Sequence, residues 1–169
     1  MPLFHRHEQN GNRYQMREKL FAIGDDFWIE NDSGEKLFKV NGKALRARST
    51  FILEDPHGEE LYKVQRKALH IHDTMEVERR GEKFATVKKA LISPLRDRFT
   101  IELDGGGELN AHGNVVDHEF KIERDGDTVA EISKRWVRVR ETYGVEVVEG
   151  EDDALMLAIT VCVDELADR

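Results

Sequence analysis

The sequence has a single cysteine, three prolines and no apolar run long enough to cross a membrane. The lone Cys162 excludes an internal disulfide, and its apolar neighbours indicate a buried thiol rather than a reactive one. The run Ala154–Val163 carries no charge, but it is well short of the roughly 20 residues that a bilayer-spanning helix needs. The start of the chain is polar and rich in histidine, unlike a signal peptide. We therefore expect a cytoplasmic protein.

Basic residues are in the minority, 26 against 34 acidic ones, and they are unevenly spread. Up to Arg98 there are 19 basic and 16 acidic residues, whereas the remainder has 7 against 18. A net charge of -8 argues against a general nucleic-acid binder, whose phosphate contacts need a basic surface. The length of 169 residues suits one domain with one core. We expect a flexible leader at residues 1–12 and a single domain at residues 13–169.

The domain is built from a repeated pattern of extended run, glycine-containing turn, extended run and basic connector. The copies lie at residues 27–40, 51–64, 75–87 and 120–132. Apolar runs flanking a glycine turn predict β-hairpins. Further strands are expected at residues 99–103 and 143–148. Short strands at regular spacing, with no helix between them, indicate a β-sandwich or a barrel.

The turn residues predict the register of each hairpin. Three-residue loops ending in glycine suit the first two copies and the fourth, and the two-residue Arg80–Gly81 turn suits the third. The predicted apolar face of the fourth copy is Phe120, Ile122, Ala130 and Ile132. The predicted cross-strand pairs are Glu30–Lys36, Ile29–Leu37, Leu53–Leu61, Glu78–Lys83 and Val77–Phe84.

The apolar run 154–163 has no polar face at either helical or strand spacing, so it must be enclosed on all sides. Acidic residues just before it favour a helix, because they supply an N-cap and a charge that the helix dipole prefers. A buried strand is the alternative, since the run is rich in β-branched residues. Asp164 and Glu165 follow the run, where the dipole disfavours acid, and the sequence alone does not account for them.

No pattern in the sequence predicts catalysis. The glycine run 105–107 lacks the Gly-Lys-Ser/Thr ending of a phosphate loop and is interpreted as a turn. His70 and His72 share one face of a strand, but a metal site needs further ligands that are not evident. No acid–base pair or activated nucleophile can be named from spacing. We expect a non-enzymatic protein without a metal or cofactor.

Basic residues follow the second strand of each hairpin, whereas the hairpin turns are mostly acidic. In a closed barrel this arrangement would gather basic connectors on one rim and acidic turns on the other. The basic rim is a candidate site for anions such as phospholipid headgroups. The alternative is that these side chains are simply solvated. The candidate anion-binding residues are Arg46, Arg48, Lys67, Lys88, Lys89, Arg96 and Arg98.

The order of motifs resembles the LURP-one-related family in its prokaryotic form. The residues that carry the resemblance are 13–27, the repeated Gly-Glu-x-(Leu/Phe) hairpins, 96–101, 113–120, 133–136 and 152–158. The resemblance implies a tubby-like fold, a closed antiparallel β-barrel of about twelve strands that encloses a hydrophobic C-terminal α-helix. The family is similar to the tubby domains, which bind phosphoinositides, and to the phospholipid scramblases. No tubby lipid-binding motif is present onto which residues can be transferred.

These observations predict a binding or scaffold domain. Its expected ligand is an anionic phospholipid headgroup, which would place the protein in the cytoplasm or peripherally on a membrane surface. The alternative is a protein–protein interaction module without lipid affinity. Nucleic acid is not an expected partner.

Overall fold

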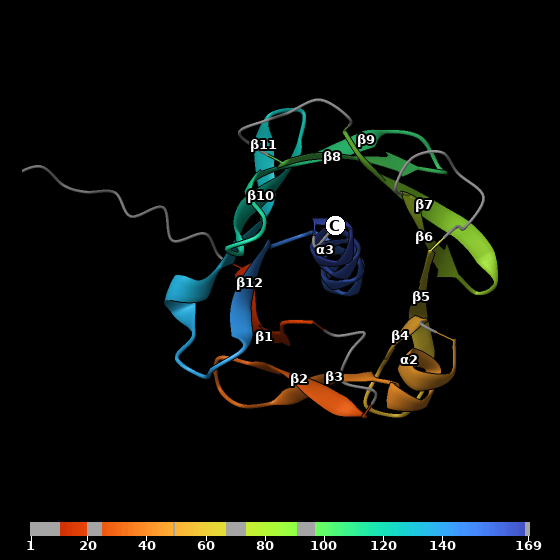
Figure 1. The fold of residues 1–169 in the computed structure, drawn as a ribbon, viewed down its shortest axis with the longest axis vertical. Helices are drawn as coiled ribbons and strands as arrows, with labels where there is room; N and C mark the ends of the chain where they lie inside the picture. Colours follow the sequence, from red (N-terminus) through yellow and green to blue (C-terminus); the bar gives the residue numbers. More distant parts are fainter. Residues whose placement is uncertain (1–10, 20–24, 49, 67–73, 91–96, 168–169) are drawn as a thin grey trace, which may run out of the picture.

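Twelve antiparallel strands close into a barrel around one helix in the computed structural model (Figure 1). The structure describes residues 11–19, 25–48, 50–66, 74–90 and 97–167, without the side chains of residues 46–48 and 97. Each strand pairs with its neighbour in the sequence, and β1 pairs with β12 to close the barrel. The first described strand begins at Gly11, and most of the predicted leader lies outside the described residues. The fold is the barrel with a C-terminal helix that we predicted.

The element bounds follow the order of the chain. The strands are β1 (Gly11–Arg17), β2 (Phe27–Asn31), β3 (Lys36–Val40), β4 (Phe51–Glu54), β5 (Glu60–Arg66), β6 (Thr74–Arg79), β7 (Glu82–Lys89), β8 (Asp97–Leu103), β9 (Glu108–Asn114), β10 (Glu119–Arg124), β11 (Asp127–Ser133) and β12 (Thr142–Val148). The helices are α2 (Gly42–Arg48), the 3-10 turn η1 (Lys134–Trp136) and α3 (Asp153–Ala167).

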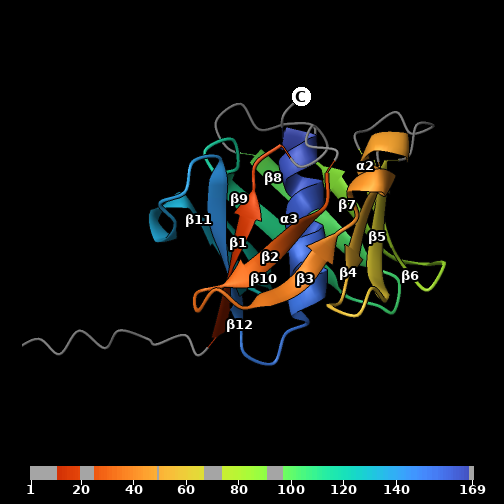
Figure 2. The same ribbon diagram turned by 90° about the horizontal axis from the view of Figure 1, so that it is seen from below.

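Helix α3 runs through the barrel interior, and its side chains form the centre of the core (Figures 1 and 2). The predicted apolar run 154–163 is buried at every position. The helix packs most closely against β5, β6 and β7. Asp152 is the N-cap, since its Oδ1 accepts a hydrogen bond from the Leu155 amide at 3.0 Å. The helical prediction is confirmed, and the alternative of a buried strand is wrong.

The first two hairpins close with the predicted three-residue loops. Gly34 and Gly58 have φ angles of 77° and 86°, the left-handed region that favours glycine. Asn31 Oδ1 accepts two backbone amide hydrogen bonds within the first loop at 3.0 Å each. Asp55 Oδ1 repeats this arrangement in the second loop at 2.8 and 2.9 Å. Both turns are therefore set by local hydrogen bonds that the sequence encodes.

A bulge next to each turn brings an additional apolar side chain toward the core. In four hairpins the register of the strand pairing shifts by one residue, which leaves one unpaired extra residue in the second strand. A bulge of this kind lets two consecutive side chains turn toward the interior. The extra residues are Leu37, Leu61, Phe84 and Val129, each packed against or within the core.

These bulges correct three of the predicted pairs. The pairs closest to the turns, Glu30–Lys36 and Glu78–Lys83, are confirmed. One step further from each turn, the extra residue shifts the partner by one position. The observed pairs are Ile29–Phe38, Leu53–Tyr62 and Val77–Ala85, in place of Ile29–Leu37, Leu53–Leu61 and Val77–Phe84.

The fourth hairpin differs from its prediction at the turn. Asp125 and Gly126 form a two-residue turn with φ angles of 51° and 85°, because Arg124 pairs directly with Asp127. Two positive φ angles in succession are typical of a type I′ turn, which an Asp-Gly sequence favours. The prediction of a three-residue loop is wrong. The predicted apolar face, residues 120, 122, 130 and 132, is confirmed and buried.

Candidate anion-binding rim

The barrel has two rims of different composition. The hairpin rim contains the β2–β3, β4–β5, β6–β7, β8–β9 and β10–β11 turns and the start of α3. The connector rim contains the end of β1, α2, the β9–β10 turn, the segment 134–141 and the end of α3 (Figure 2). Acidic residues predominate in the turns of the hairpin rim, and basic residues cluster along the connector rim, as the hairpin repeat predicted.

The predicted anion-binding residues have unequal outcomes. Lys67 and Arg96 lie outside the described residues. Arg46 and Arg48 belong to α2 on the connector rim, where their backbone alone is described. The remaining three, Lys88, Lys89 and Arg98, are described fully.

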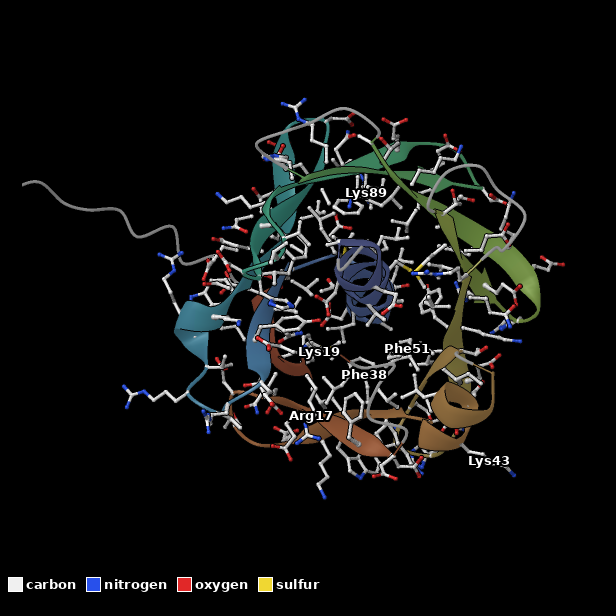
Figure 3. All side chains as sticks on the ribbon, in the orientation of Figure 1. Arg17, Lys19, Phe38, Lys43, Phe51 and Lys89 are labelled. Carbon is white, nitrogen blue, oxygen red and sulfur yellow. The ribbon has the colours of Figure 1, made fainter. Side chains whose placement is uncertain are left out.

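Lys88 and Lys89 belong to β7 and not to a connector. Lys88 Nζ contacts both carboxylate oxygens of Glu102 on the outer face, at 3.1 and 3.2 Å. Lys89 Nζ donates to the Leu166 carbonyl at 3.4 Å, near the end of α3 (Figure 3). Lys88 is thus neutralised by a neighbouring strand, and Lys89 contributes to the end of the helix.

Arg98 is the predicted residue whose described surroundings best suit an anion. It is exposed near the connector-rim end of β8 and makes no ion pair with the described residues. Beside it is a depression of about 490 Å³ whose polar lining includes Thr100, Asn110 and His112. The hydroxyl and amide groups provide hydrogen-bonding capacity next to the guanidinium, whereas His112 Nε2 lies 3.1 Å from Glu123 Oε1.

Four further basic residues meet where β1 ends and β12 begins. Arg17 pairs with Thr142 across the ladder. Directly after β1, the Glu18 amide donates to the Glu141 carbonyl at 2.9 Å. This pairing brings the end of β1 beside the segment 134–141. The residues are Arg17, Lys19, Arg138 and Arg140, all exposed. Figure 3 shows Arg17 and Lys19 on the opposite side of α3 from Lys89. We did not predict Arg17 and Lys19 as site residues, because they belong to no hairpin connector.

A buried charged cluster lies inside this rim. His118 Nε2 is 2.6 Å from Asp164 Oδ1, and its Nδ1 is 3.6 Å from Glu18 Oε1. The Tyr143 ring stacks on the imidazole with centroids 4.3 Å apart. Glu18 also pairs with Lys134. The cluster therefore joins the end of β1, the β9–β10 turn, η1 and the end of α3.

The cluster explains the two acids at the C-terminal end of α3. Asp164 is paired with His118, and Glu165 Oε1 lies 3.4 Å from Arg66 Nη2. Carboxylates at this end oppose the helix dipole, so partners of positive or hydrogen-bonding character must offset them. The sequence carried a signal for this cluster, since two acids at the wrong end of a buried helix require counter-groups.

The segment 134–141 is held against the outside of β12. Trp136 packs over Gly144, where an added Cβ would lie 3.1 Å from the indole ring. The Arg13 guanidinium also lies over that ring, 4.7 Å from its centroid. Thr142 Oγ1 donates to the Val139 carbonyl at 2.6 Å. Gly144 thus permits the close packing of Trp136 that holds this segment against β12.

The structure bears on the thiol and on the metal alternative that the sequence raised. Cys162 is fully buried, and desolvation raises the pKa of its thiol well above the ordinary value. Within residues 11–19, 25–48, 50–66, 74–90 and 97–167, no group of three or more His, Cys, Asp or Glu residues could hold a metal ion. His70 and His72, the metal alternative of the sequence, lie outside these ranges.

Comparison with known proteins identifies the family. The family model described as LURP-one-related matches residues 12–164. The chain belongs to the LURP-one-related family. Among solved structures, this LURP-one-related chain is similar to the X-ray structure of a protein from Arabidopsis thaliana, with 15% identity and a TM-score of 0.65. The similarity covers 94% of this chain and 92% of that one, and it shows a common fold. No curated protein matches the chain.

One further finding bears on membranes. Among the described residues of this LURP-one-related chain, no helix combines the length and the apolar character needed to cross a bilayer. Helix α3 has 15 residues, and it is enclosed by the barrel.

Proposed function

We propose that this LURP-one-related protein binds the anionic headgroups of phospholipids through its connector rim. The observation that carries the proposal is a set of basic side chains on this rim that make no ion pair within the part of the chain that is described. Such cations are available to an external anion. They are Arg17, Lys19, Lys43, Arg98, Arg138 and Arg140.

The opposite rim supports the proposal by its charge. The turns of the hairpin rim contain acidic residues that include Asp32, Asp55, Asp104 and Asp125, all at the far end of the barrel. An anionic surface would attract the connector rim and repel the hairpin rim, so the barrel would approach it in one orientation.

The expected strength is moderate and depends on salt. A basic residue near an anionic membrane contributes about 1 kcal/mol, and this attraction falls off within a Debye length. Binding by several such residues would be measurable at low ionic strength and would weaken greatly at high ionic strength.

Vesicle sedimentation tests the proposal. We expect the protein to sediment with vesicles that contain phosphatidylserine, and not with neutral phosphatidylcholine vesicles. Raising the salt from about 0.1 M to about 1 M shortens the Debye length from ~10 Å to ~3 Å and should release the protein. The double variant Arg17→Glu with Arg138→Glu should bind at least about tenfold more weakly, since two attractive contributions become repulsive.

A matched control separates local from global charge. Arg80 and Lys36 are exposed and lie at the hairpin rim, one in the β6–β7 turn and one at the start of β3. The variant Arg80→Glu with Lys36→Glu changes the net charge equally and should retain binding. Equal loss in both variants would show that the rim has no special role. Absence of binding to anionic vesicles at low salt would refute the lipid proposal and favour a protein partner.

A further inference from the structure

Two large apolar side chains are exposed among the described residues, and both lie on the connector rim. Val116 is 61% exposed in the β9–β10 turn, and Val139 is 57% exposed in the segment 134–141. A single exposed valine is ordinary on any protein surface. What distinguishes these two is that both lie at the rim that carries the unpaired cations.

The β9–β10 turn holds Val116 outward. Its neighbour Val115 is fully buried, and the His118 amide donates to the Val115 carbonyl at 3.0 Å. Asn114 braces the turn, because its Oδ1 accepts from the Asp117 amide at 3.2 Å and its Nδ2 donates to Asp117 Oδ2 at 2.7 Å. The turn therefore fixes one valine in the core and presents the next one to solvent.

The segment 134–141 holds Val139 outward in the same way. The Val137 amide donates to the Lys134 carbonyl at 3.2 Å, and the Val139 carbonyl is bound by the Thr142 hydroxyl. Trp136 anchors the segment on Gly144. Both valines are thus presented by braced backbone, so ordering them at a surface would cost little conformational entropy.

The two presenting segments are joined by one carboxylate. Glu18 pairs with Lys134 at the start of one segment and lies 3.6 Å from His118 at the end of the other. The part of the connector rim formed by residues 17–19, 114–118 and 134–141 is called the arc below. Its exposed acids are Asp117 and Glu141. They are outnumbered by its exposed cations, which are Arg17, Lys19, Lys134, Arg135, Arg138 and Arg140.

Exposed valines surrounded by basic side chains suit the region of a phospholipid bilayer where the headgroups meet the acyl chains. Amphipathic surface elements bind there by burying a small apolar face while basic residues contact anionic headgroups. A typical protein interface buries ~800 Å² of total surface per partner around an apolar centre, whereas only two separate large apolar side chains are exposed among the described residues. The observations therefore favour a bilayer over a protein at this arc.

We infer that Val116 and Val139 insert into the interfacial region of an anionic bilayer when the connector rim binds it. The inference rests on the proposed function and adds an apolar contribution that salt does not screen. It also sets the orientation of the barrel, with the β9–β12 side of the rim and the end of β1 against the membrane and the hairpin rim away from it.

The test compares two double variants on the same vesicles. Val116→Thr with Val139→Thr keeps the side-chain shape but adds hydroxyls, and it should weaken binding to phosphatidylserine vesicles several-fold to about tenfold. Val116→Leu with Val139→Leu adds apolar area and should strengthen binding by a few-fold. Both positions are exposed, so thermal melting should stay close to that of the wild type.

Tryptophan fluorescence gives a second readout. The chain has two tryptophans, and Trp28→Phe leaves Trp136 as a reporter three residues from Val139. Quenching of Trp136 by brominated phospholipids should be strong, and it should diminish in the threonine variant. Equal binding by all three proteins, with no quenching, would overturn the inference and leave the electrostatic proposal intact. Failure of the wild type to bind anionic vesicles would overturn both.

Discussion

The two ends of α3 are fixed to the barrel by different chemistry. At the hairpin rim, phenol hydroxyls donate to helix carboxylates: Tyr14 binds Asp153, and Tyr62 binds Asp152 at 2.5 Å. At the connector rim, ionic and capping contacts serve the same purpose, with Asp164 held by His118 as the most buried example. One end uses neutral donors, whereas the other uses groups that can carry positive charge.

The difference follows from the helix dipole. Acids at the start of the helix are favoured by the dipole, so a neutral phenol is a sufficient partner and the rim remains acidic. Acids at the end of the helix are disfavoured, so this end draws on basic residues that include Arg66. The connector rim consequently contains one set of inward cations for the helix and another set of outward cations available to a ligand.

The largest effect should come from the middle of α3, which depends on neither end. Leu157 is fully buried in the barrel, so Leu157→Asp would place an unpaired charge among apolar side chains. We expect loss of soluble, folded protein, whereas the volume-conserving Leu157→Met should cost less than ~1.5 kcal/mol. Expression and circular dichroism melting would measure both. A cooperatively melting Leu157→Asp protein would contradict enclosure of the helix.

Removing the acid at the connector end should have the next largest effect. Asp164→Ala removes the hydrogen-bond partner of His118 Nε2 and should lower the free energy of unfolding by about 2 to 3 kcal/mol, measured by urea denaturation. The matching change at the hairpin end, Asp153→Ala, should cost only about 1 kcal/mol. If Asp164→Ala stabilises the protein instead, the dipole penalty outweighs the contact with His118.

The smallest effect should come from the phenols, and it should depend on pH. Burial and the hydrogen bond to a helix carboxylate raise the pKa of Tyr14 and Tyr62 above the ordinary value near 10. Each phenol therefore contributes stability that is complete below about pH 10 and is lost at higher pH, where the unfolded chain ionises first. Replacing both by phenylalanine should cost about 1 kcal/mol per residue at neutral pH.

The double variant should also lose stability less steeply above about pH 10 than the wild type, in denaturation series at increasing pH. The buried Cys162 has a raised thiol pKa and contributes in the same sense, but it is present in both proteins. An unchanged slope would show that the two phenols ionise equally in folded and unfolded protein.

Local chemistry explains what the sequence predicts well. Gly34 and Gly58 end their loops because the left-handed conformation is a property of single residues. The enclosure of the run 154–163 is similarly predictable because it has no polar face, and the acids before it favour a helix over a strand. The bulges at Leu37 and Leu61 are less evident, although two consecutive apolar residues in a strand that otherwise alternates are their signal.

The candidate site is harder to predict because it assembles residues that are distant in sequence. The end of β1 with Arg17 lies beside the segment 134–141 only through the pairing of β1 with β12, which no local pattern specifies. Lys88 belongs to the predicted set but is neutralised by Glu102 on the neighbouring strand β8. Which cations are free therefore depends on cross-strand neighbours, and those follow from register.

The ladder between β1 and β12 has a consequence for synthesis of the chain. Gly11 pairs with Val148, so an early strand must wait for a partner made more than a hundred residues later. At 5–20 residues per second, that delay lasts on the order of ten seconds. Helix α3 follows β12 in the chain. The inward-facing apolar side chains of the strands therefore lack their packing partner until both elements have left the ribosome. A nascent chain of this kind would present uncovered strands to chaperones, and its closure would be slow because the decisive contacts are the most distant ones.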